Sequence, residues 1–353
     1  MNFSRRKVLQ LIPVVTGGVA MGDFDFLMID NQKKVLEGVR TFFQKVANKN
    51  GTFRPGIAKD YAGNSDTKFS GIAAPTYAVI IHKTFGWELP YEQATIGFFL
   101  SCQKEDGAFY APTGEGDMET PLAKLYNTVQ SVAALKILGR EPKYDPTPVI
   151  NYFFEGNRFQ DLPLYTTSFF ALFYSAWRTK MPSNIDEKMR GYLKDNQTAD
   201  GYIGDHVAST FHAAHYYRLI GEETPLAKEM VNRVLKDQKE DGSWSLHQPD
   251  WDVHAVFDAL FVLKQVGGFA NRKKEIKQAY RKANDWILTC QKEDGGFSHF
   301  PGNEPSDVDA VYFHVAALVE SGYLKPVRGI ENEEIYGWGH LMDPDKTYNC
   351  LAE

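Results

Sequence analysis

The sequence predicts an all-α fold, an α6/α6 toroid in which six helical hairpins close into a ring of six inner and six outer helices. Two observations predict it. A short phrase of glutamine, aspartate, glycine and an aromatic residue recurs along the 353-residue chain. Around its copies, a helical pattern that is apolar on nearly every face alternates with an amphipathic one. Because such units stack into one body, a chain of this length needs no division into several average-sized domains.

The recurring phrase defines the units of the ring. Three strong copies run from Gln103 to Phe109, from Gln238 to Trp244 and from Gln291 to Phe297, and weaker copies run from Asn50 to Phe53 and from Gln197 to Tyr202. Their glycines stand at positions 51, 107, 201, 242 and 295, so the gaps are 56, 94, 41 and 53 residues. The gap of 94 residues is two periods with a degenerate copy near Glu155 to Phe159, which makes six units.

The flanking patterns predict where helices begin and end. A buried inner helix is expected from Asp252 to Leu263, closed by Gly267, and an amphipathic outer helix from Asn271 to Cys290. Thr120-Pro121 and Thr224-Pro225 read as helix starts. The expected stops of the other inner helices are Gly86, Gly139, Gly221 and Gly322.

Charge and cysteine content exclude some classes of function. The formal net charge is −6 and no long basic run follows the N-terminus, so we expect no nucleic-acid partner. The cysteines, Cys102, Cys290 and Cys350, are too few and too scattered for a disulfide framework or a thiolate zinc site. Cys102 and Cys290 occupy the same place in two copies of the repeat, which predicts a packing role.

The N-terminus resembles a twin-arginine export signal. Arg5 and Arg6 precede a modestly apolar stretch from Leu11 to Gly22, although Val8 and Gln10 depart from the usual pattern. We therefore expect an export signal over residues 1–27, the toroid over 28–325 and a C-terminal extension over 326–353, with the protein in the periplasm or cell envelope. A basic helix start, or retention of the segment as an anchor, remains open.

Polar residues recur at the beginnings of the inner helices. Because parallel inner helices gather their first turns at one end of the ring, residues equally far from each stop glycine should lie together. Counting back 15 residues gives Lys124, His206, Asp252 and Asp307; two residues further on lie Tyr126, Ala208, His254 and Asp309; one turn deeper lie Gln130, His212, Asp258 and Phe313. Buried carboxylates and imidazoles cost several kcal/mol, and a functional site is a usual reason for that cost. The alternative is that they cap and cross-link helices, as Asp252 and Asp307 would at N-cap positions.

The phrase also resembles the QW motif of squalene cyclases and the repeat of prenyltransferase β subunits, over about residues 29 to 325. The resemblance implies the toroid, in which the glutamine and the aromatic residue of the motif tie neighbouring hairpins together. It does not by itself imply a reaction, because one fold hosts many functions.

Two site patterns of prenyltransferase β subunits are incomplete here. The segment from Asp252 to His254 is similar to their zinc-binding Asp-x-Cys with His in place of Cys, and Ala310 stands where a second motif has its His ligand. The Arg and Lys of their diphosphate clamp become Leu246 and Pro249. Protein prenylation is therefore disfavoured.

A metal site is still compatible with these residues. A zinc ion held by Asp252, His254 and Asp309, joined by His206 or His212, is chemically reasonable because imidazole and carboxylate suit zinc. A zinc-dependent enzyme of the prenyltransferase β type is therefore kept as an alternative, and no other cofactor is indicated.

The segment from Ser306 to Ala310 resembles the Asp-x-Asp-Asp motif with which class II terpene cyclases protonate an alkene or epoxide. It keeps the middle aspartate, Asp309, and loses the last one. The chemistry requires a carboxylic acid kept protonated by burial and by a neighbouring anion, here Asp307. His254 or His314 could orient that acid.

We therefore expect an exported lyase or isomerase, similar to terpene cyclases, that acts on an apolar small molecule or lipid and is compatible with peripheral membrane association. Asp309 would be the general acid, with Asp307 and His254 tuning it. Substrate-binding residues would be Tyr126, Phe211, His212, Phe257, Asp258, Tyr312 and Phe313. Alternatives are a non-catalytic binding or scaffold protein of the cell envelope and, less favoured, a polysaccharide-degrading toroid. His215, His247 and His299 receive no role.

Overall fold

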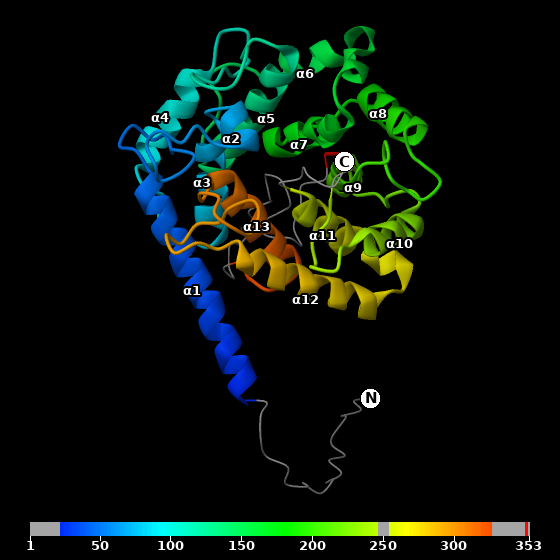
Figure 1. Cartoon of the computed structure of the whole chain (residues 1–353). Coiled ribbons are helices and arrows are strands. Elements are labelled where there is room, and N and C mark those ends of the chain that lie inside the picture. The colour runs from blue at the N-terminus through cyan, green and yellow to red at the C-terminus, as the bar shows by residue number, and fades with distance from the viewer. Residues whose placement is uncertain (1–21, 246–253, 327–349, 352–353) are drawn as a thin grey trace, which may run out of the picture.

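The computed structural model describes residues 22–245, 254–326 and 350–351, and this part of the chain forms α-helices and short 3-10 turns without a strand. Six helices build an inner ring: α3 (Ala73–Thr84), α5 (Pro121–Ile137), α7 (Thr167–Trp177), α9 (Val207–Leu219), α11 (Ala255–Val266) and α13 (Val308–Glu320). Each packs against the next, and α13 packs against α3, which closes the ring (Figure 1). The all-α toroid predicted from the sequence is confirmed.

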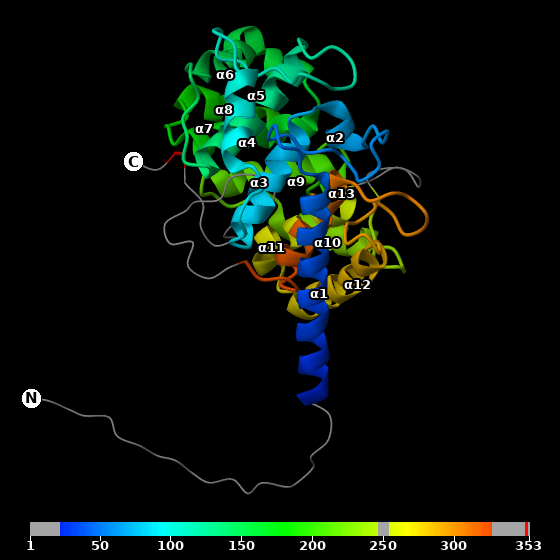
Figure 2. The ribbon, with the colours of Figure 1, turned by 90° about the vertical axis from the view of Figure 1, so that its left-hand side faces the viewer.

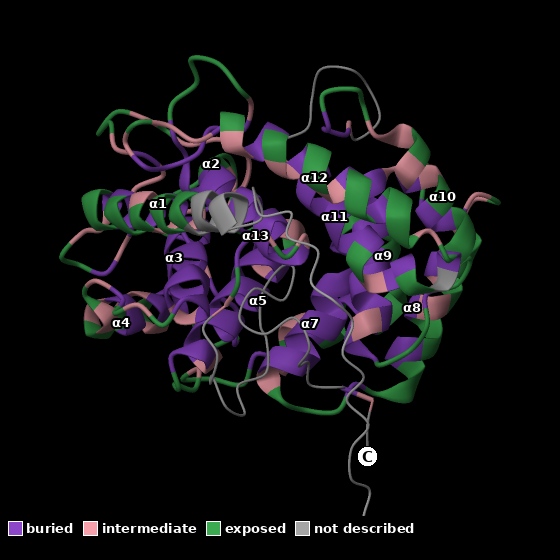
Figure 3. Cartoon of the chain, turned by 90° about the horizontal axis from the view of Figure 1, so that it is seen from below, coloured by how far each residue is buried: buried purple, intermediate pink, exposed green. Residues whose placement is uncertain are grey.

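Six outer helices precede the inner ones in the chain and surround them. They are α1 (Gly22–Val46), α4 (Glu92–Cys102), α6 (Thr147–Phe154), α8 (Ser183–Asp195), α10 (Ala227–Asp237) and α12 (Lys273–Thr289). Figure 3 shows inner helices that are almost wholly buried and outer helices with an exposed stripe. In α13 every residue is buried, whereas α12 buries Ile276, Ala279, Ala283, Trp286 and Ile287. This is the alternation that the sequence pattern predicts.

One helix was not predicted. The short α2 (Ser65–Phe69) precedes α3 and lies at the end of the ring where the site described below is found. Asn64 caps it, because the Asn64 side chain accepts a hydrogen bond from the backbone of Ser65 at 2.8 Å. Three 3-10 turns, Glu155–Asp161, Leu164–Thr166 and Gly267–Ala270, complete the described elements.

The glutamines of the phrase join neighbouring hairpins. Gln103 Nε2 donates to the carbonyl of Gly107 at 3.1 Å and to that of Tyr144, in the next unit, at 2.8 Å. The pattern recurs for Gln197 with Gly201 and Pro225, for Gln238 with Gly242 and Ala279, and for Gln291 with Gly295 and Val35. Since Val35 lies in α1, the last contact ties the last hairpin to the first.

The phrase glycines let adjacent backbones approach. Gly295 has a φ of +94°, and a Cβ there would stand 2.2 Å from the carbonyl oxygen of Gly38 in α1. The degenerate copy differs, since a Cβ on Gly156 would meet nothing within 4 Å. That copy therefore lacks the close approach of the others.

Most predicted helix ends agree with the structure, and one helix start does not. Thr120 caps α5, and Gly86, Gly139, Gly221 and Gly322 follow their helices with left-handed φ values. The Thr224-Pro225 start is wrong, because α10 begins at Ala227 after Leu226 in the left-handed region. Gly267 follows the last residue of α11 as its C-cap, as predicted, and a 3-10 turn to Ala270 comes before Asn271 takes the left-handed conformation.

The described residues include part of each chain end and all three cysteines. The predicted export signal lies mostly outside the described residues, and α1 runs across the expected boundary at residue 28, its N-terminal half projecting from the ring (Figure 2). None of the described helices combines the length and apolarity needed to cross a bilayer. Of the C-terminal extension, Cys350 is described, and its backbone N–H donates to Leu219 at 3.3 Å. All three cysteines are buried, and burial raises the pKa of Cys290 to about 12.

Candidate functional site

The first turns of neighbouring inner helices contact one another at one end of the ring. His254, which precedes α11, bonds to Asp309 in the first turn of α13 at 2.8 Å. Ser168 in α7 bonds to His212 in α9 at 2.7 Å. Tyr126 in α5 lies near Tyr77 in α3, with 3.4 Å between their hydroxyl oxygens. Residues from distant parts of the sequence therefore meet where the repeat places them.

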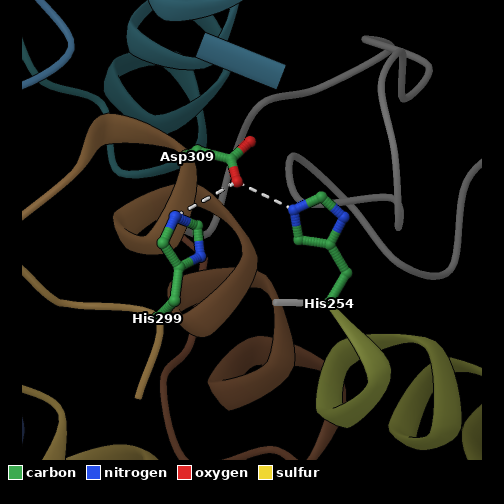
Figure 4. A group of neighbouring side chains, drawn as sticks. All are labelled: His254, His299 and Asp309. Atoms are coloured by element: carbon green, nitrogen blue, oxygen red, sulfur yellow. Dashed lines mark hydrogen bonds and ion pairs between the residues drawn. The ribbon is translucent and has the colours of Figure 1, made fainter. Parts of the chain in front are cut away.

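Asp309 is the centre of this arrangement. Figure 4 shows it between His254 and His299, and its Oδ2 lies 2.8 Å from His254 Nε2 and 3.6 Å from His299 Nε2. The Asp309 side chain is 0% exposed, whereas that of His254 is 18% exposed. Among the described residues, the other oxygen, Oδ1, is buried with no hydrogen-bond partner. Such an atom is costly to bury unless it serves a bound molecule or a reaction.

Asp307 holds the start of α13 in place. It is the N-cap, and its Oδ1 accepts from the backbone N–H of Asp309 at 2.7 Å. The same carboxylate accepts from Thr67 Oγ1 at 3.0 Å and from the backbone N–H of Asn64 at 3.1 Å. The structure therefore places Asp307 as the cap and cross-link that the sequence left open, anchoring α2 to α13 beside Asp309.

The acid–base properties of the pair follow from burial and charge. Burial raises the pKa of the Asp309 carboxyl from 3.8 to about 8, against the opposing effect of His254. Burial would lower the pKa of His254, but the Asp309 carboxylate outweighs it and raises that pKa to about 9. Because the charged form of each stabilises the charged form of the other, the two titrate as a unit. The pair therefore keeps at least one proton at neutral pH.

The predicted ring-bearing residues form a connected wall beside this pair. The Phe313 ring stacks on His254 with centroids 3.6 Å apart, Phe257 lies 5.3 Å from Phe313, and Phe211 lies 5.1 Å from Phe257. The Tyr312 ring stacks on Tyr77 at 4.0 Å. All are buried. The wall runs from α3 through α13 and α11 to α9.

The remaining predicted residues are also placed. His212 is buried, and burial lowers its pKa, so it is a neutral imidazole hydrogen-bonded to Ser168. Asp258 is 2% exposed, and its charge helps to raise the pKa of His254. His206 caps α9 by accepting from the backbone N–H of Ser209 at 3.3 Å. Asp252, Leu246, Pro249 and His247 lie outside the described residues.

Sequence reasoning missed His299. It lies eight residues after the phrase glutamine Gln291, where the strong copy at Gln103 has Ala111 and the weaker copy at Gln197 has Asp205. In the structure His299 is 2% exposed and faces Asp309. A comparison of the copies in register would have marked this histidine as an exception that packing of the repeat does not require.

It also missed Asp66, which lies in α2. Tyr77 donates a hydrogen bond to Asp66 Oδ2, and Tyr126 is bonded to the same carboxyl. Ser65, the preceding residue, lies 3.5 Å from His254 Nε2. A five-residue helix has too short a pattern for periodicity to reveal, so no sequence signal singled out this carboxylate.

Of the candidate ligands, His254, His299 and Asp309 could hold a metal ion. One ligand atom from each lies within 4.8 Å of the others. Two imidazoles and a carboxylate form a donor set that suits zinc. Two of the predicted ligands, His254 and Asp309, are in this group. The third member is His299, and not His206 or His212 as expected.

Comparisons with known proteins agree with the architecture. A family model for the prenyltransferase alpha-alpha toroid domain matches residues 20–204 and 166–339, and the chain belongs to this family. The β subunit of type-1 geranylgeranyl transferase from Arabidopsis thaliana is 29% identical over 229 residues, which cover 62% of this chain and 54% of that protein. The chain thus spans about half the length of this curated relative.

Solved structures with the same fold include a type II terpene cyclase from Scytonema bound to its substrate, geranylgeranyl dihydroxybenzoate. Its TM-score is 0.54 at 14% identity, covering 84% of this chain and 98% of that one. A glycosidase in complex with glucose has a TM-score of 0.54 at 10% identity, covering 87% of this chain and 100% of that one. At such identities the likeness establishes the fold and leaves the reaction to the site.

Proposed function

We propose that this toroid binds an uncharged isoprenoid at the mouth formed by its inner helices and protonates a double bond or epoxide of that ligand with Asp309. The protonation would start a cyclisation or an isomerisation. The observation that carries the proposal is the Asp309 carboxyl, which is 0% exposed, has a raised pKa and leaves one oxygen without a hydrogen bond among the described residues.

The hydrogen bonds indicate which oxygen of Asp309 carries the proton. Oδ2 is bonded to His254 Nε2, so in the neutral acid it accepts the imidazole N–H and the transferable proton resides on Oδ1. As that O–H bond breaks, its proton bonds to one alkene carbon with the π electron pair, which leaves a cation on the other carbon. The Asp309 carboxylate that remains is stabilised by His254.

The surroundings favour an uncharged substrate that becomes cationic. The faces of Phe313, Phe257 and Tyr312 stabilise positive charge through their ring quadrupoles. The carboxylates of Asp66 and Asp307 act on Asp309 at the same end of the ring, where they would repel a diphosphate. That the β subunit of a geranylgeranyl transferase and a terpene cyclase with a geranylgeranyl substrate are similar to this chain supports an isoprenoid ligand.

We also propose that residues 1–27 direct export to the periplasm or cell envelope, where an apolar lipid would reach the protein by peripheral membrane association. The twin Arg5-Arg6 motif supports this location. A fusion of residues 1–27 to a reporter protein tests it: export should depend on both arginines, and export of an Arg5→Lys, Arg6→Lys double variant at the normal level would reject it.

The test of the acid is turnover of uncharged polyprenes, squalene and geranylgeraniol, followed by mass spectrometry in D2O. Wild-type protein should place one deuterium in each product. Asp309→Asn should lose activity by about a thousandfold, in the range expected for a general acid. Asp60→Asn, a change at an exposed carboxylate, is the matched control. Tight binding of either polyprene by the wild type without any product would instead favour a non-catalytic binding protein.

A second candidate, a zinc-dependent enzyme, is favoured by the proximity of His254, His299 and Asp309. A bound zinc ion would supply Lewis-acid chemistry, and these three side chains would hold it. The two roles exclude each other, because a metal ligand must be deprotonated and Asp309 could not then serve as the acid. Elemental analysis after dialysis against zinc decides: about one zinc per wild-type chain and none in His299→Ala supports the metal site, whereas a zinc-free wild type rejects it.

A further inference from the structure

Two phenols and a carboxylate form a second polar cluster at the same end of the ring. Tyr77 and Tyr126, from the adjacent helices α3 and α5, are 0% and 5% exposed. Tyr77 donates to Asp66 Oδ2, Tyr126 is bonded to the same carboxyl, and 3.4 Å separates the two hydroxyl oxygens. The repeat does not account for this cluster, and none of its three residues transfers a proton in the proposed protonation by Asp309.

The cluster lies on the same aromatic wall as the proposed acid. The Tyr77 ring stacks on Tyr312 at 4.0 Å and meets Phe313 edge-on at 5.8 Å, while the Phe313 ring stacks on His254. The charge of Asp66 contributes to the raised pKa of the Asp309 carboxyl, so the two carboxyls share one electrostatic environment. The same set of packed rings therefore connects the two carboxyls.

The helix α2 fixes the two groups relative to each other. Asp66 lies in α2, and Thr67 of the same helix donates to Asp307. Asp307 in turn caps α13 through the backbone N–H of Asp309. The short helix α2 therefore fixes the position of Asp66 relative to that of Asp309.

We propose that Asp66, reached through the hydroxyls of Tyr77 and Tyr126, receives the proton that the final cation loses. The inference rests on the proposed function, since protonation by Asp309 generates that cation. The C–H bond next to the cationic carbon breaks, its electron pair becomes the new double bond, and its proton goes to a phenol oxygen. That phenol passes its own proton to the Asp66 carboxylate and is restored.

The exposure of the groups agrees with one proton entering and one leaving in each cycle. Asp309 is fully buried, so its proton must come through its partner His254, which is 18% exposed. Asp66 is half-buried and can return its proton to water. Burial and the charge of Asp66 raise the pKa of Tyr77 and of Tyr126 well above the ordinary value, which keeps both as phenols that relay protons. Proton gain and loss therefore balance over the cycle.

The experiment compares Asp66→Asn, Tyr77→Phe and Tyr126→Phe with wild type and with Asp60→Asn, using geranylgeraniol and squalene in D2O. Each product should still carry a single deuterium, because Asp309 is intact. The fraction of the wild-type alkene should fall at least about fivefold, replaced by isomeric alkenes and by alcohols from water capture. A role in folding alone would lower consumption and leave the product ratio unchanged.

The outcomes distinguish the Asp66 relay from the role of Asp309 as the acid, on which the relay depends. An unchanged product ratio in both Tyr77→Phe and Asp66→Asn overturns the relay while leaving Asp309 as the acid. If wild type consumes neither probe, or Asp309→Asn consumes them normally, the acid and the relay both fail. Should Asp66→Asn not fold, Tyr77→Phe, which removes one hydroxyl and keeps the ring stack, decides alone.

Discussion

Buried polar side chains gather in two regions of this molecule, the seams between hairpins and the mouth where the inner helices begin. In the seams Gln103 is fully engaged: Nε2 donates twice, and Oε1 accepts from the backbone N–H groups of Lys143 and Tyr144 at 2.7 and 3.1 Å. At the mouth Asp309 leaves Oδ1 without a hydrogen bond among the described residues. Both regions place polar atoms in an apolar interior, yet at the mouth one of them is left unsatisfied among the described residues.

The difference teaches how to separate structural from functional polarity in a repeat protein. A polar group that recurs in most units and is fully bonded stabilises the ring, because each unit faces the same packing problem. A polar group present in one unit and left partly unsatisfied carries a cost that the repeat does not explain. Substitution in the seams should therefore change stability, and substitution at the mouth should change chemistry.

Among the seam variants, the largest loss of stability is expected at a glycine of the phrase. Gly295→Ala should lower the free energy of unfolding by about 3 kcal/mol, because the residue has a φ of +94° and the new Cβ would stand 2.2 Å from the Gly38 carbonyl oxygen. Urea unfolding followed by circular dichroism measures it.

Gly156→Ala is the matched control for that change. Its φ of +66° is also left-handed, but a Cβ there would meet nothing within 4 Å. The cost should be about 1 kcal/mol, the strain of the backbone conformation alone. Equal losses in the two variants would mean that close approach of the hairpins is not what the phrase glycine provides.

The seams were predictable from the sequence and the mouth was predictable only in part. The phrase is local, since its glutamine donates a hydrogen bond to the glycine four residues later. It also recurs, and its spacing predicted the ring. His254 and Asp309 followed from equivalent positions on inner helices. His299 differs from the residues at the same place in the other copies, but its contact with Asp309 is not visible in the sequence, and nothing in the sequence singles out Asp66. The five-residue α2 has no period to detect.

A smaller effect tests whether every seam is equally strong. Gln103→Ala should cost about 2 kcal/mol, because it removes four hydrogen bonds at 2.7 to 3.1 Å, of which the one to Gly107 is buried and the others are partly buried. Gln291→Ala should cost about 1 kcal/mol or less, since both of its bonds are 3.4 Å long. Unfolding midpoints in urea give the order, and a larger loss in Gln291→Ala would show that ring closure onto α1 is the critical seam.

The last prediction concerns the mouth, where the effect of Asp309→Asn on stability should change sign with pH. Folding raises the pKa of Asp309 from 3.8 to about 8 and that of His254 from 6.5 to about 9. Between about pH 4 and 9 the folded chain therefore binds more protons than the unfolded chain, and stability should fall as pH rises through that window. Asp309→Asn removes the carboxyl and also the charge that raises the pKa of His254, so its stability should vary less with pH. It should equal or exceed that of the wild type at the upper end.

Urea unfolding at about pH 5, 7 and 9 measures this dependence, with Asp60→Asn as the control for loss of an exposed carboxylate. The control should follow the wild-type slope, because it leaves the buried pair of Asp309 and His254 intact. A parallel slope in Asp309→Asn would mean that the buried pair does not hold its proton. The contrast between a satisfied seam and a mouth poised for proton transfer would then be lost, since a carboxyl that ionises like any other cannot act as the proposed acid near neutral pH.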